Sequence, residues 1–289
     1  MARVRKAVLP VAGLGTRVLP ATKSIPKEML PVFDRPAIQY VVDEAKAAGI
    51  EHFVFVTGRN KGAIEDYFDR AYELESTLAN KNKNGVLEEL EATLPEPGSM
   101  SFVRQQAPKG LGHAIWCARD VIGDEPFAIL LPDVIVKARP SCLAQMISVY
   151  DKVGGNVIAV EEVPEERVSS YGVIDPVERD GAMVRMKGMV EKPPRETAPS
   201  NLAITGRYVL QPEIFALLAA QGAGAGGEIQ LTDAMAKLMG SQDFHAVVYD
   251  GKSYDCGSKI GYLEATVAHA LADDENGEAA RALLKEMLR

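Results

Sequence analysis

The chain has 289 residues with a net charge of −8 at pH 7, and 47% of its residues are hydrophobic. This length suffices for one large α/β domain, or for a domain with a small satellite lobe. The acidic balance argues against nucleic-acid partners, and no apolar run is long enough to span a membrane. The N-terminal residues lack the features of a signal peptide. The 3 cysteines have no metal-site spacing and fit reduced thiols, so we expect a cytoplasmic protein.

The first predicted element is a strand over residues 7–12, which leads into a turn containing Gly13 and Gly15. Glycine has no Cβ, so the N–H groups of such a turn can approach an anion closely. Prolines then prevent a long helix and hold out three cations: Arg17, Lys23 and Lys27. We predict that residues 8–36 form a cradle for a polyphosphate. An ordinary β-turn with scattered surface lysines is the alternative.

This glycine turn differs from two common nucleotide-binding patterns. The dinucleotide fingerprint G-x-G-x-x-G fails because Val18 stands where the third glycine is required. The G-K-[ST] ending of a P-loop is also missing from the sequence of the turn. The pattern therefore disfavours a dehydrogenase or a kinase.

Strands and helices alternate through the first half of the chain, which is typical of a parallel sheet with crossover helices. The predicted elements are a helix at 36–49, a strand at 52–57, a helix at 61–72, a strand at 100–104, a helix at 113–122, a strand at 127–131 and a helix at 140–153. Residues 73–99 interrupt this alternation with a polar stretch. We interpret that stretch as a helical surface insertion, with a lid or an oligomer contact as alternatives.

The second half favours antiparallel pairing, because strands follow one another without full helices between them. The predicted strands are 156–163, 171–177, 182–190 and 202–210. The chain continues with a helix at 212–220, a flexible loop at 222–227 and a helix at 233–239 with Thr232 as its N-cap. It ends with a last strand at 244–249 and amphipathic helices at 260–272 and 278–288. The prediction is one α/β domain with a mixed, mostly parallel sheet and a small antiparallel portion.

Ligands of such open sheets bind beyond the carboxyl ends of the strands. The loop with Gly13, the loop with Gly110 and the residue Asp133 all follow predicted strands, so we expect them to converge. Asp133 ends an apolar strand, where a carboxylate is costly unless it is paired or bound to a metal. Mg²⁺ prefers one or two carboxylates together with phosphate oxygens and water. Asp133 fits one ligand and Asp255 a second, although Asp255 can also be a simple turn residue.

Several segments of the chain resemble the sugar-phosphate nucleotidylyltransferase family, and in particular its bacterial members that act on UTP and glucose 1-phosphate. The resemblance is carried, in chain order, by AGLGTR and PATKSIPKEMLP near the N-terminus, then by QQAPKGLGHA, LLPDV, SSYGVIDP, VEKP, ITGRYVL, GEIQLTDAM and YDCGSKIGYL. The matches cover almost the whole chain. The resemblance implies a Rossmann-like nucleotidyltransferase fold over residues 1–289. Its nucleotide-binding part spans about 1–153, its sugar-phosphate-binding part about 154–258, and its oligomerisation helices about 259–289.

The resemblance also implies the reaction and its participants. UTP and glucose 1-phosphate are expected to give UDP-glucose and pyrophosphate, with Mg²⁺ as the cofactor. A thymidine triphosphate or another sugar is an alternative, and so is a non-catalytic regulator that binds sugar nucleotides. The sequence does not set the strictness for base and sugar, the feedback ligands or the downstream pathway.

Roles for the nucleotide side follow residue by residue from the resemblance. Ala12, Gly13 and Gly15 are expected to meet the nucleotide through their backbone groups. Gln105 is expected to read the uracil edge with Gly110 nearby; its neighbour in the QQ pair is less favoured on spacing. Among the charged residues, Arg17 is expected to grip the triphosphate and Lys27 to steady the sugar phosphate. Asp133 completes this set as the expected metal ligand.

Roles for the sugar side follow in the same way. Glu191 is expected to accept hydrogen bonds from glucose hydroxyls and Lys192 to bind the sugar's phosphate, although from residue type alone both are ordinary strand-end charges. Gly172 and Ile204 are expected to line the sugar pocket. His113 is expected to contribute polarity near the nucleotide rather than act as a base, because a phosphate monoester is already ionised near neutral pH.

The last two predicted helices carry more apolar residues than one buried face requires. These residues are Leu263, Val267, Leu271, Leu283, Leu284 and Leu288. We therefore expect a homodimer or a homotetramer.

Overall fold

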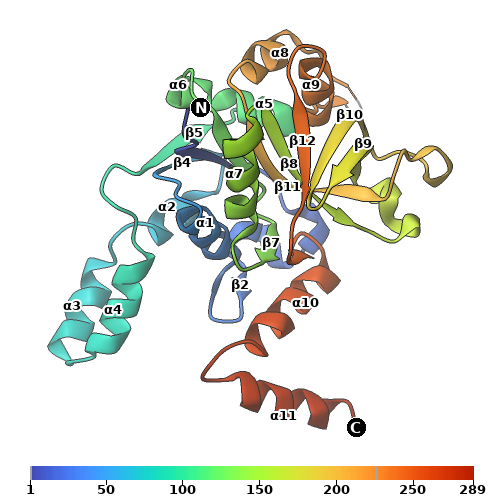
Figure 1. The fold of residues 1–289 in the computed structure, drawn as a ribbon. Helices are drawn as coiled ribbons and strands as arrows, with labels where there is room; N and C mark the ends of the chain where they lie inside the picture. Colours follow the sequence, from blue (N-terminus) through green and yellow to red (C-terminus); the bar gives the residue numbers. More distant parts are fainter. Residues whose placement is uncertain (1, 225–226) are drawn as a thin grey trace.

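A mixed sheet runs through the centre of the computed structural model, which describes residues 2–224 and 227–289 (Figure 1). Within these residues the sheet has 9 strands in the order β5-β4-β1-β6-β11-β8-β12-β10-β9. Their bounds are β5 (Met100–Arg104), β4 (His52–Thr57), β1 (Lys6–Pro10), β6 (Phe127–Leu130), β11 (Leu202–Leu210), β8 (Asn156–Glu162), β12 (Phe244–Val248), β10 (Met183–Glu191) and β9 (Gly172–Asp180). Two small ribbons pair β2 (Pro31–Val32) with β3 (Arg35–Pro36) and β7 (Val134–Lys137) with β13 (Lys252–Asp255).

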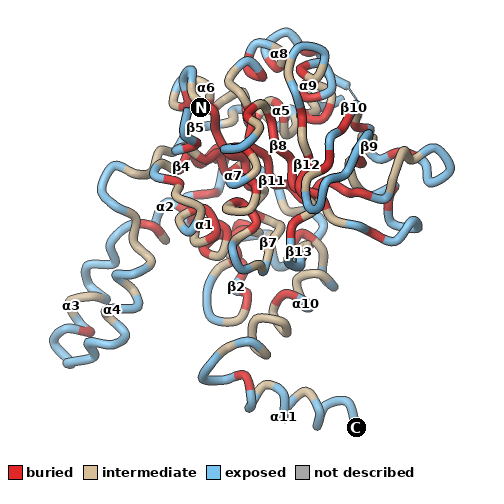
Figure 2. Tube along the Cα trace, viewed as in Figure 1, coloured by how far each residue is buried: buried red, intermediate tan, exposed pale blue. Residues whose placement is uncertain are grey.

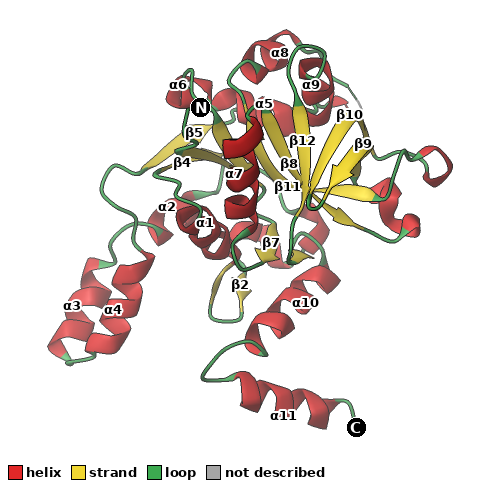
Figure 3. Cartoon of the chain, viewed as in Figure 1, coloured by secondary structure: helices red, strands yellow, loops and turns green. Residues whose placement is uncertain are grey.

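Helices cover both faces of this sheet (Figure 3). The α-helices are α1 (Ala37–Ala47), α2 (Gly62–Tyr67), α3 (Tyr72–Asn80), α4 (Asn84–Thr93), α5 (Leu111–Cys117), α6 (Arg119–Ile122), α7 (Cys142–Val153), α8 (Ile214–Ala220), α9 (Leu231–Leu238), α10 (Lys259–Ala270) and α11 (Gly277–Met287). Short 3₁₀ turns are η1 (Thr16–Val18), η2 (Ala21–Lys23), η3 (Lys27–Met29), η4 (Glu165–Ser170) and η5 (Arg195–Thr197). Within the described part of the chain, no helix combines the length and apolarity that crossing a bilayer requires.

The two faces of the sheet form two separate apolar cores, because alternate side chains of a strand point to opposite faces. On β1, Val8 packs with residues of α5, α6, α8 and α9, whereas Ala7 and Leu9 pack with residues of α1, α2 and α7. Figure 2 shows the buried strands between the helices. This double coverage explains why the strands read as continuous apolar runs in the sequence.

The direction of the strands changes at β11. Strands β5, β4, β1 and β6 are parallel, whereas β11 is antiparallel to β6 on one side and to β8 on the other. The predicted α/β fold with a mixed sheet and an antiparallel C-terminal portion is confirmed. Because β5, β4, β1 and β6 are parallel neighbours, the loops that follow them lie along one edge.

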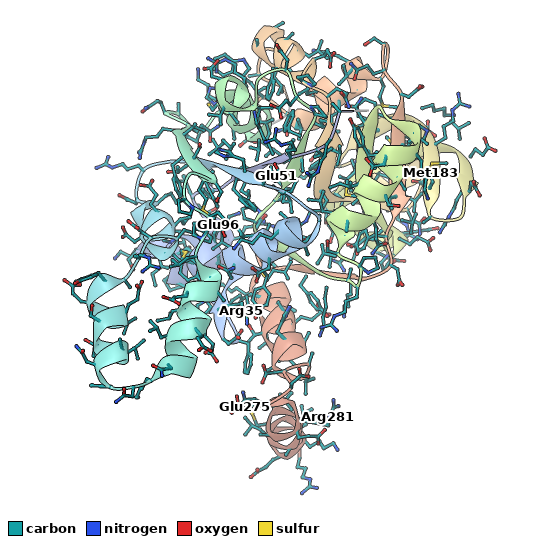
Figure 4. The ribbon with its side chains drawn as sticks, turned by 60° about the vertical axis from the view of Figure 1, so that its left-hand side comes forward. Arg35, Glu51, Glu96, Met183, Glu275 and Arg281 are labelled. Carbon is teal, nitrogen blue, oxygen red and sulfur yellow. The ribbon has the colours of Figure 1, made fainter. Side chains whose placement is uncertain are left out.

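Two segments project from this body. The polar stretch predicted as a helical excursion is confirmed as the pair α3 and α4, whose outer surface is largely exposed (Figure 2). At the C-terminus, α10 packs against β13 and β2 through Ala265, whereas in α11 Gly277 is the buried residue among those described. Figure 4 shows Glu275 and Arg281 well outside the body of the protein. Neither projection contributes to the two cores of the sheet.

Several predicted boundaries are wrong. The helix predicted over 61–72 ends at Tyr67, and Tyr72 begins α3 instead. The helix predicted over 113–122 begins at Leu111 and is divided in two at Ala118. The strand at 244–249 is not the last one, because β13 follows it and pairs with β7. In the loop predicted as flexible at 222–227, residues 225–226 lie outside the described residues.

The predicted N-cap of the helix near residue 233 is also wrong. The helix α9 begins at Leu231, and its N-cap is Gln230. Thr232 therefore lies inside the first turn, and its hydroxyl donates to Oε2 of Glu191 over 2.9 Å. A tertiary hydrogen bond has replaced the local capping role that the residue type suggested.

Candidate active site

The loop after β1 is held in a tight turn by backbone and side-chain bonds. Gly15 has φ 67°, a left-handed conformation that favours glycine, and it is the N-cap of η1, which carries Arg17. Thr22 closes the turn by donating from Oγ1 to the carbonyl of Gly15 over 2.7 Å. Gly13 is exposed, so the turn presents its backbone to solvent at the carboxyl end of β1.

A buried ion pair places Lys27 at the end of this loop. The next residue, Glu28, is 0% exposed and accepts a hydrogen bond from Nζ of Lys61 over 2.8 Å. Because Glu28 is anchored inside η3, the neighbouring Lys27 side chain is directed along the glycine turn. A Cβ on Gly13 would lie 3.6 Å from Cε of Lys27, so the ammonium stem runs beside this glycine.

Lys27 and Arg17 both contact the carboxylate of Asp133. Asp133 lies in the turn between β6 and β7, and its Oδ2 accepts a hydrogen bond from Nζ of Lys27 over 2.6 Å. Nη2 of Arg17 is 3.4 Å from the same oxygen, but the Arg17 side chain is 63% exposed. The half-buried Lys27 contact is therefore the stronger of the two, since solvent screens the Arg17 contact.

The fourth charged residue, Asp255, faces the same point. Nη1 of Arg17 is 3.6 Å from Oδ2 of Asp255, which ends β13. A Cβ on Gly257 would lie within 3.0 Å of Nη2 of Arg17, Oδ1 of Asp255 and Oδ2 of Asp133. The structure thus brings together all four of these predicted residues, and a side chain at position 257 would collide with three of them.

The charges in this cluster shift the pKa values of Lys27 and Asp133 in opposite directions. Burial alone lowers the pKa of Lys27, but the negative charges of Asp133 and Glu28 outweigh burial and raise it. Burial alone raises the pKa of Asp133, but the charge and hydrogen bond of Lys27, with the charge of Arg17, outweigh burial and lower it. Both groups are therefore ionised across the neutral range.

Two carboxylates suit Mg²⁺ when the remaining ligands are phosphate oxygens and water. Asp133 and Asp255 direct oxygens to one point, as the Gly257 contacts show. Among the described residues, no group of three or more histidine, cysteine or acidic side chains gathers that could hold a metal ion without other ligands. The donor set thus fits a hard cation shared with a phosphate ligand, and it does not fit a closed structural site.

The loop with Gln105 lies at the same edge of the sheet. The backbone N–H of Gln105 donates to the carbonyl of Thr57 over 2.8 Å, and Gly58 approaches Ala12, which places Gln105 and Ala12 on either side of the end of β4. The segment before α9 is hydrogen-bonded to this loop. Ile229 donates to the carbonyl of Lys109 over 2.7 Å.

Gly110 of this loop has φ 98°, and a Cβ there would lie 2.7 Å from Cβ of Glu228 and 2.9 Å from the carbonyl of Ile229. Glycine is therefore required at position 110 for its conformation and for the close approach. Its carbonyl accepts a hydrogen bond from Nε2 of Gln105 over 3.1 Å.

The same amide nitrogen of Gln105 is 3.0 Å from Nδ1 of His113. A carbonyl can only accept, so the atom of Gln105 that faces Gly110 is the amide nitrogen, and it also donates to His113. Nδ1 of His113 is then an unprotonated acceptor, and burial lowers the pKa of this imidazole. His113 therefore orients the side chain of Gln105.

A second group of predicted residues gathers around Glu191 at the end of β10. A Cβ on Gly172 would lie 3.1 Å from Oε2 of Glu191 and 3.2 Å from Cδ1 of Ile204, so these three residues share one site. Thr232, which the sequence did not assign to the site, holds the same oxygen of Glu191. Lys192 is 64% exposed, and its Nζ is 3.6 Å from Oε1 of Glu191. Lys192 also has φ 48°, which turns the backbone after β10.

Tyr208 on β11 links the two groups. The side chain is buried at 6% exposure, and burial, with the negative charges of Glu191 and Asp133, raises the pKa of its phenol. Both carboxylates are thus close enough to act on one tyrosine. The strand pairing agrees with this, because β11 carries Ile204 of the Glu191 site and pairs through Arg207 with Leu130, just before the turn that carries Asp133.

A buried ion pair that the sequence analysis did not assign lies directly behind Asp133. Arg207 on β11 is 0% exposed and donates to Glu44 of α1, to the carbonyl of Leu131 over 3.1 Å and to the carbonyl of Val134 over 2.7 Å. The sequence signal for Arg207 was a charged residue within the apolar strand LAITGRYVL. Nothing in the sequence indicates Glu44 as its partner.

Comparison with known proteins identifies the family. The model of the family described as "Nucleotidyl transferase" matches residues 6–271 of this chain. The UTP–glucose-1-phosphate uridylyltransferase of Komagataeibacter xylinus is 56% identical over 257 residues, covering 89% of this chain and 90% of its own length.

Two solved structures are similar over nearly the whole fold. UTP-bound UGPase from Acinetobacter baumannii has a TM-score of 0.91 at 48% identity, covering 98% of this chain and 99% of its own. A UDP-glucose pyrophosphorylase complexed with UDP-glucose has a TM-score of 0.86 at 46% identity, covering 93% of this chain and 100% of its own.

The contact between Lys27 and Asp133 predicts how stability depends on pH. The lowered pKa of Asp133 gives a contribution that is present above its ordinary pKa of 3.8 and is lost as the pH falls through the lower folded value. The raised pKa of Lys27 gives a contribution that is present below 10.5 and is lost only at higher pH. We expect the difference in melting temperature between the wild type and Asp133→Asn to be constant from about pH 5 to 9 and to shrink below about pH 4.

This difference is measured by thermal unfolding in buffers of constant ionic strength. The control is Asp180→Asn, at the exposed end of β9. We expect its difference from the wild type to be small at every pH. A difference for Asp133→Asn that changes between pH 5 and 9 contradicts the assignment of both ionised forms.

Proposed function

This chain belongs to the nucleotidyl transferase family, and from that membership we propose that it is a UTP–glucose-1-phosphate uridylyltransferase. The enzyme joins UTP and α-D-glucose 1-phosphate into UDP-glucose and releases pyrophosphate. The observation that carries the proposal is the meeting of Arg17, Lys27, Asp133 and Asp255 at one point beside the glycine turn. A relative with UTP bound and another with UDP-glucose bound share this fold over most of the chain.

The reaction is a direct displacement at phosphorus. A phosphate oxygen of glucose 1-phosphate attacks the α-phosphorus of UTP, and the bond to the β,γ-pyrophosphate breaks. The attacking phosphate is already ionised near neutral pH, so no general base is required. Two anions must be brought together, so positioning and electrostatic stabilisation provide most of the rate enhancement.

The cations of the site have complementary roles in this proposal. Arg17 is exposed, and its planar guanidinium binds the triphosphate. Lys27 is half-buried beside Gly13 and steadies the attacking phosphate. Lys192 is exposed next to Glu191 and binds the phosphate of the sugar. Each of these cations has an acidic partner in the free protein, and a phosphate ligand takes the place of that partner.

A divalent metal, which we propose to be Mg²⁺, is held by Asp133 with Asp255 as a second ligand. When bound, Mg²⁺ neutralises charge on the phosphate oxygens of the nucleotide. The chain's own part is to present two carboxylates at one point and to keep Asp133 ionised through Lys27 and Arg17. We expect the two cations to move from Asp133 towards phosphate groups as the nucleotide binds.

Base and sugar are selected by the two flanking loops. We propose that Ala12, Gly13 and Gly15 bind the nucleotide through their backbone and that Gln105, held by His113 beside Gly110, reads the edge of the uracil. On the other side, Glu191 accepts hydrogen bonds from glucose hydroxyls. Gly172 and Ile204 form the wall of that pocket. In this proposal residues 1–289 form one domain, with the nucleotide part at 1–153 and the sugar part at 154–258.

The exposed apolar residues of the C-terminal helices support a homo-oligomer, either a dimer or a tetramer. Ile260 and Leu263 on α10 are 75% and 57% exposed, and Leu283 and Met287 on α11 are 57% and 74% exposed. Exposed apolar residues gathered in this way mark interaction sites. The free thiols of the three cysteines, all in the described residues, support a cytoplasmic location.

Removal of Arg17 tests the phosphate cradle. We expect Arg17→Ala to lower turnover about a hundredfold, on the scale of a deleted transition-state donor, with little change in melting temperature because the side chain is exposed. The measurement is pyrophosphate release with UTP and glucose 1-phosphate. The control is Arg70→Ala, whose side chain is 64% exposed and paired only with residues of the α3–α4 segment. Near-normal turnover of Arg17→Ala contradicts the role.

A substrate panel tests the choice of base, sugar and metal. Four nucleoside triphosphates are combined with glucose or galactose 1-phosphate, with Mg²⁺ and after its removal by a chelator. We expect the fastest pyrophosphate release with UTP, glucose 1-phosphate and Mg²⁺, and loss of activity without a divalent metal. Equal rates with dTTP favour a thymidylyltransferase, and no release with any pair favours a non-catalytic binding protein.

Light scattering tests the oligomer. We expect the full chain at micromolar concentration to have a mass above the 31.2 kDa of one copy. Replacement of Leu283 and Met287 by aspartate should lower that mass, whereas Glu278→Ala on the same helix should not. A single species of monomer mass for the unmodified chain contradicts the oligomer.

A further inference from the structure

Arg207 is an unusual residue for its position. It lies in the middle of β11, which is buried along its whole length, and its side chain is 0% exposed. Burial alone lowers the pKa of Arg207, but Glu44 outweighs this effect and the pKa is raised, so the guanidinium is charged. A buried charge pair is often no more stabilising than apolar residues of the same volume. Stability alone therefore does not account for this arginine.

The guanidinium is held rigidly by Glu44. Nε donates to both carboxylate oxygens of Glu44 over 3.1 Å, and Nη2 donates to Oε2 over 2.8 Å. Glu44 is itself fixed, because its Oε1 also accepts from the backbone N–H of Leu143 at the start of α7. Two helices and one strand thus set the position of the guanidinium.

The remaining donors of Arg207 point to the turn that carries Asp133. Nη1 donates to the carbonyl of Leu131 over 3.1 Å, and Nη2 donates to the carbonyl of Val134 over 2.7 Å. These carbonyls stand on either side of Asp133, two residues before it and one residue after it. The turn is also closed by the N–H of Val134, which donates to Leu131 over 3.3 Å. The planar fork of arginine can reach both carbonyls at once, which the point charge of lysine cannot do.

We propose that Arg207 is a positioning residue that sets the location of Asp133 by holding both ends of its turn. Its catalytic consequence rests on the proposed function, whereas its effect on the turn does not. A displacement of about 1 Å at a reacting centre can lower a rate about a hundredfold. With the turn released, Asp133 no longer stays within reach of Lys27 and Asp255, and the charged cluster loses its geometry.

The test uses a variant that removes the bonds to the turn without leaving a charge unpaired. Arg207→Met alone leaves Glu44 buried without a partner and is expected to destabilise the fold strongly. The main variant is therefore the double substitution Glu44→Gln/Arg207→Met, which is neutral and keeps an acceptor for the N–H of Leu143. The control is Val209→Ala on the same face of β11, which weakens the core but leaves the turn's bonds in place.

The first readout is hydrogen exchange of the free protein, which requires no activity. We expect faster exchange of a peptide covering residues 131–137 in the double variant, and little change of that peptide in Val209→Ala. The second readout is steady-state kinetics well below the melting temperature. We expect kcat to fall about a hundredfold in the double variant, with a higher Mg²⁺ requirement and a KM for glucose 1-phosphate that changes little. Mn²⁺ binding to the free protein should weaken in parallel.

Three results overturn the proposal. Unchanged exchange in residues 131–137 shows that Arg207 does not hold the turn. Faster exchange with a wild-type kcat shows that the turn's position does not matter for the reaction. A kcat lowered equally in Val209→Ala shows a general effect of stability. If the unmodified protein releases no pyrophosphate, the proposed function fails, and the exchange and Mn²⁺ measurements still decide whether Arg207 positions Asp133.

Discussion

The attraction between Asp133 and Lys27 is the contact on which the site depends. The two charges are 2.6 Å apart, and each side chain is 16% exposed, so water screens them less than it screens the surface pairs of this protein. Because they come from opposite ends of the N-terminal half, the contact ties the glycine turn to the turn that leads into the two-stranded sheet of β7 and β13. Arg17 joins the pair from the solvent side and extends it to Asp255. The cluster is thus a set of opposite charges held together at one point.

Three of the predicted site residues are held in place by other side chains. Glu28 and Lys61 anchor the turn that carries Lys27, His113 orients Gln105, and Thr232 fixes Glu191. Such supporting contacts reduce the freedom of the groups that meet the substrate, which is how an active site keeps its geometry. The two buried ion pairs behind the site have the same character. Their hydrogen bonds fix the positions and directions of charged groups inside the protein, which apolar packing alone cannot do.

The fold and the charged cluster could be predicted from the sequence, but these supporting contacts could not. The alternation of strands and helices predicted a parallel sheet whose strands end along one edge. Asp133 was indicated because a carboxylate at the end of an apolar strand needs a partner. Arg207 and Glu44 are 163 residues apart, so no local pattern could pair them. The strands β7 and β13 are too short to show a period and are joined only by tertiary pairing. Thr232 was misassigned because its local capping preference gave way to the bond with Glu191.

The strand β11 carries both Ile204, beside Glu191, and Arg207, behind Asp133, and it is irregular between them. Ile204 stands near one end of it and Arg207 three residues further along. Its pairing with β8 shifts register between Ile204 and Tyr208, and Gly206 has φ 73°. Position 206 requires glycine, because its φ lies in the left-handed region and a Cβ there would lie 2.8 Å from Cδ1 of Leu131. The N–H of Leu131 also donates to the carbonyl of Gly206 over 2.9 Å, so the bend of this strand and the position of the turn that carries Asp133 are coupled.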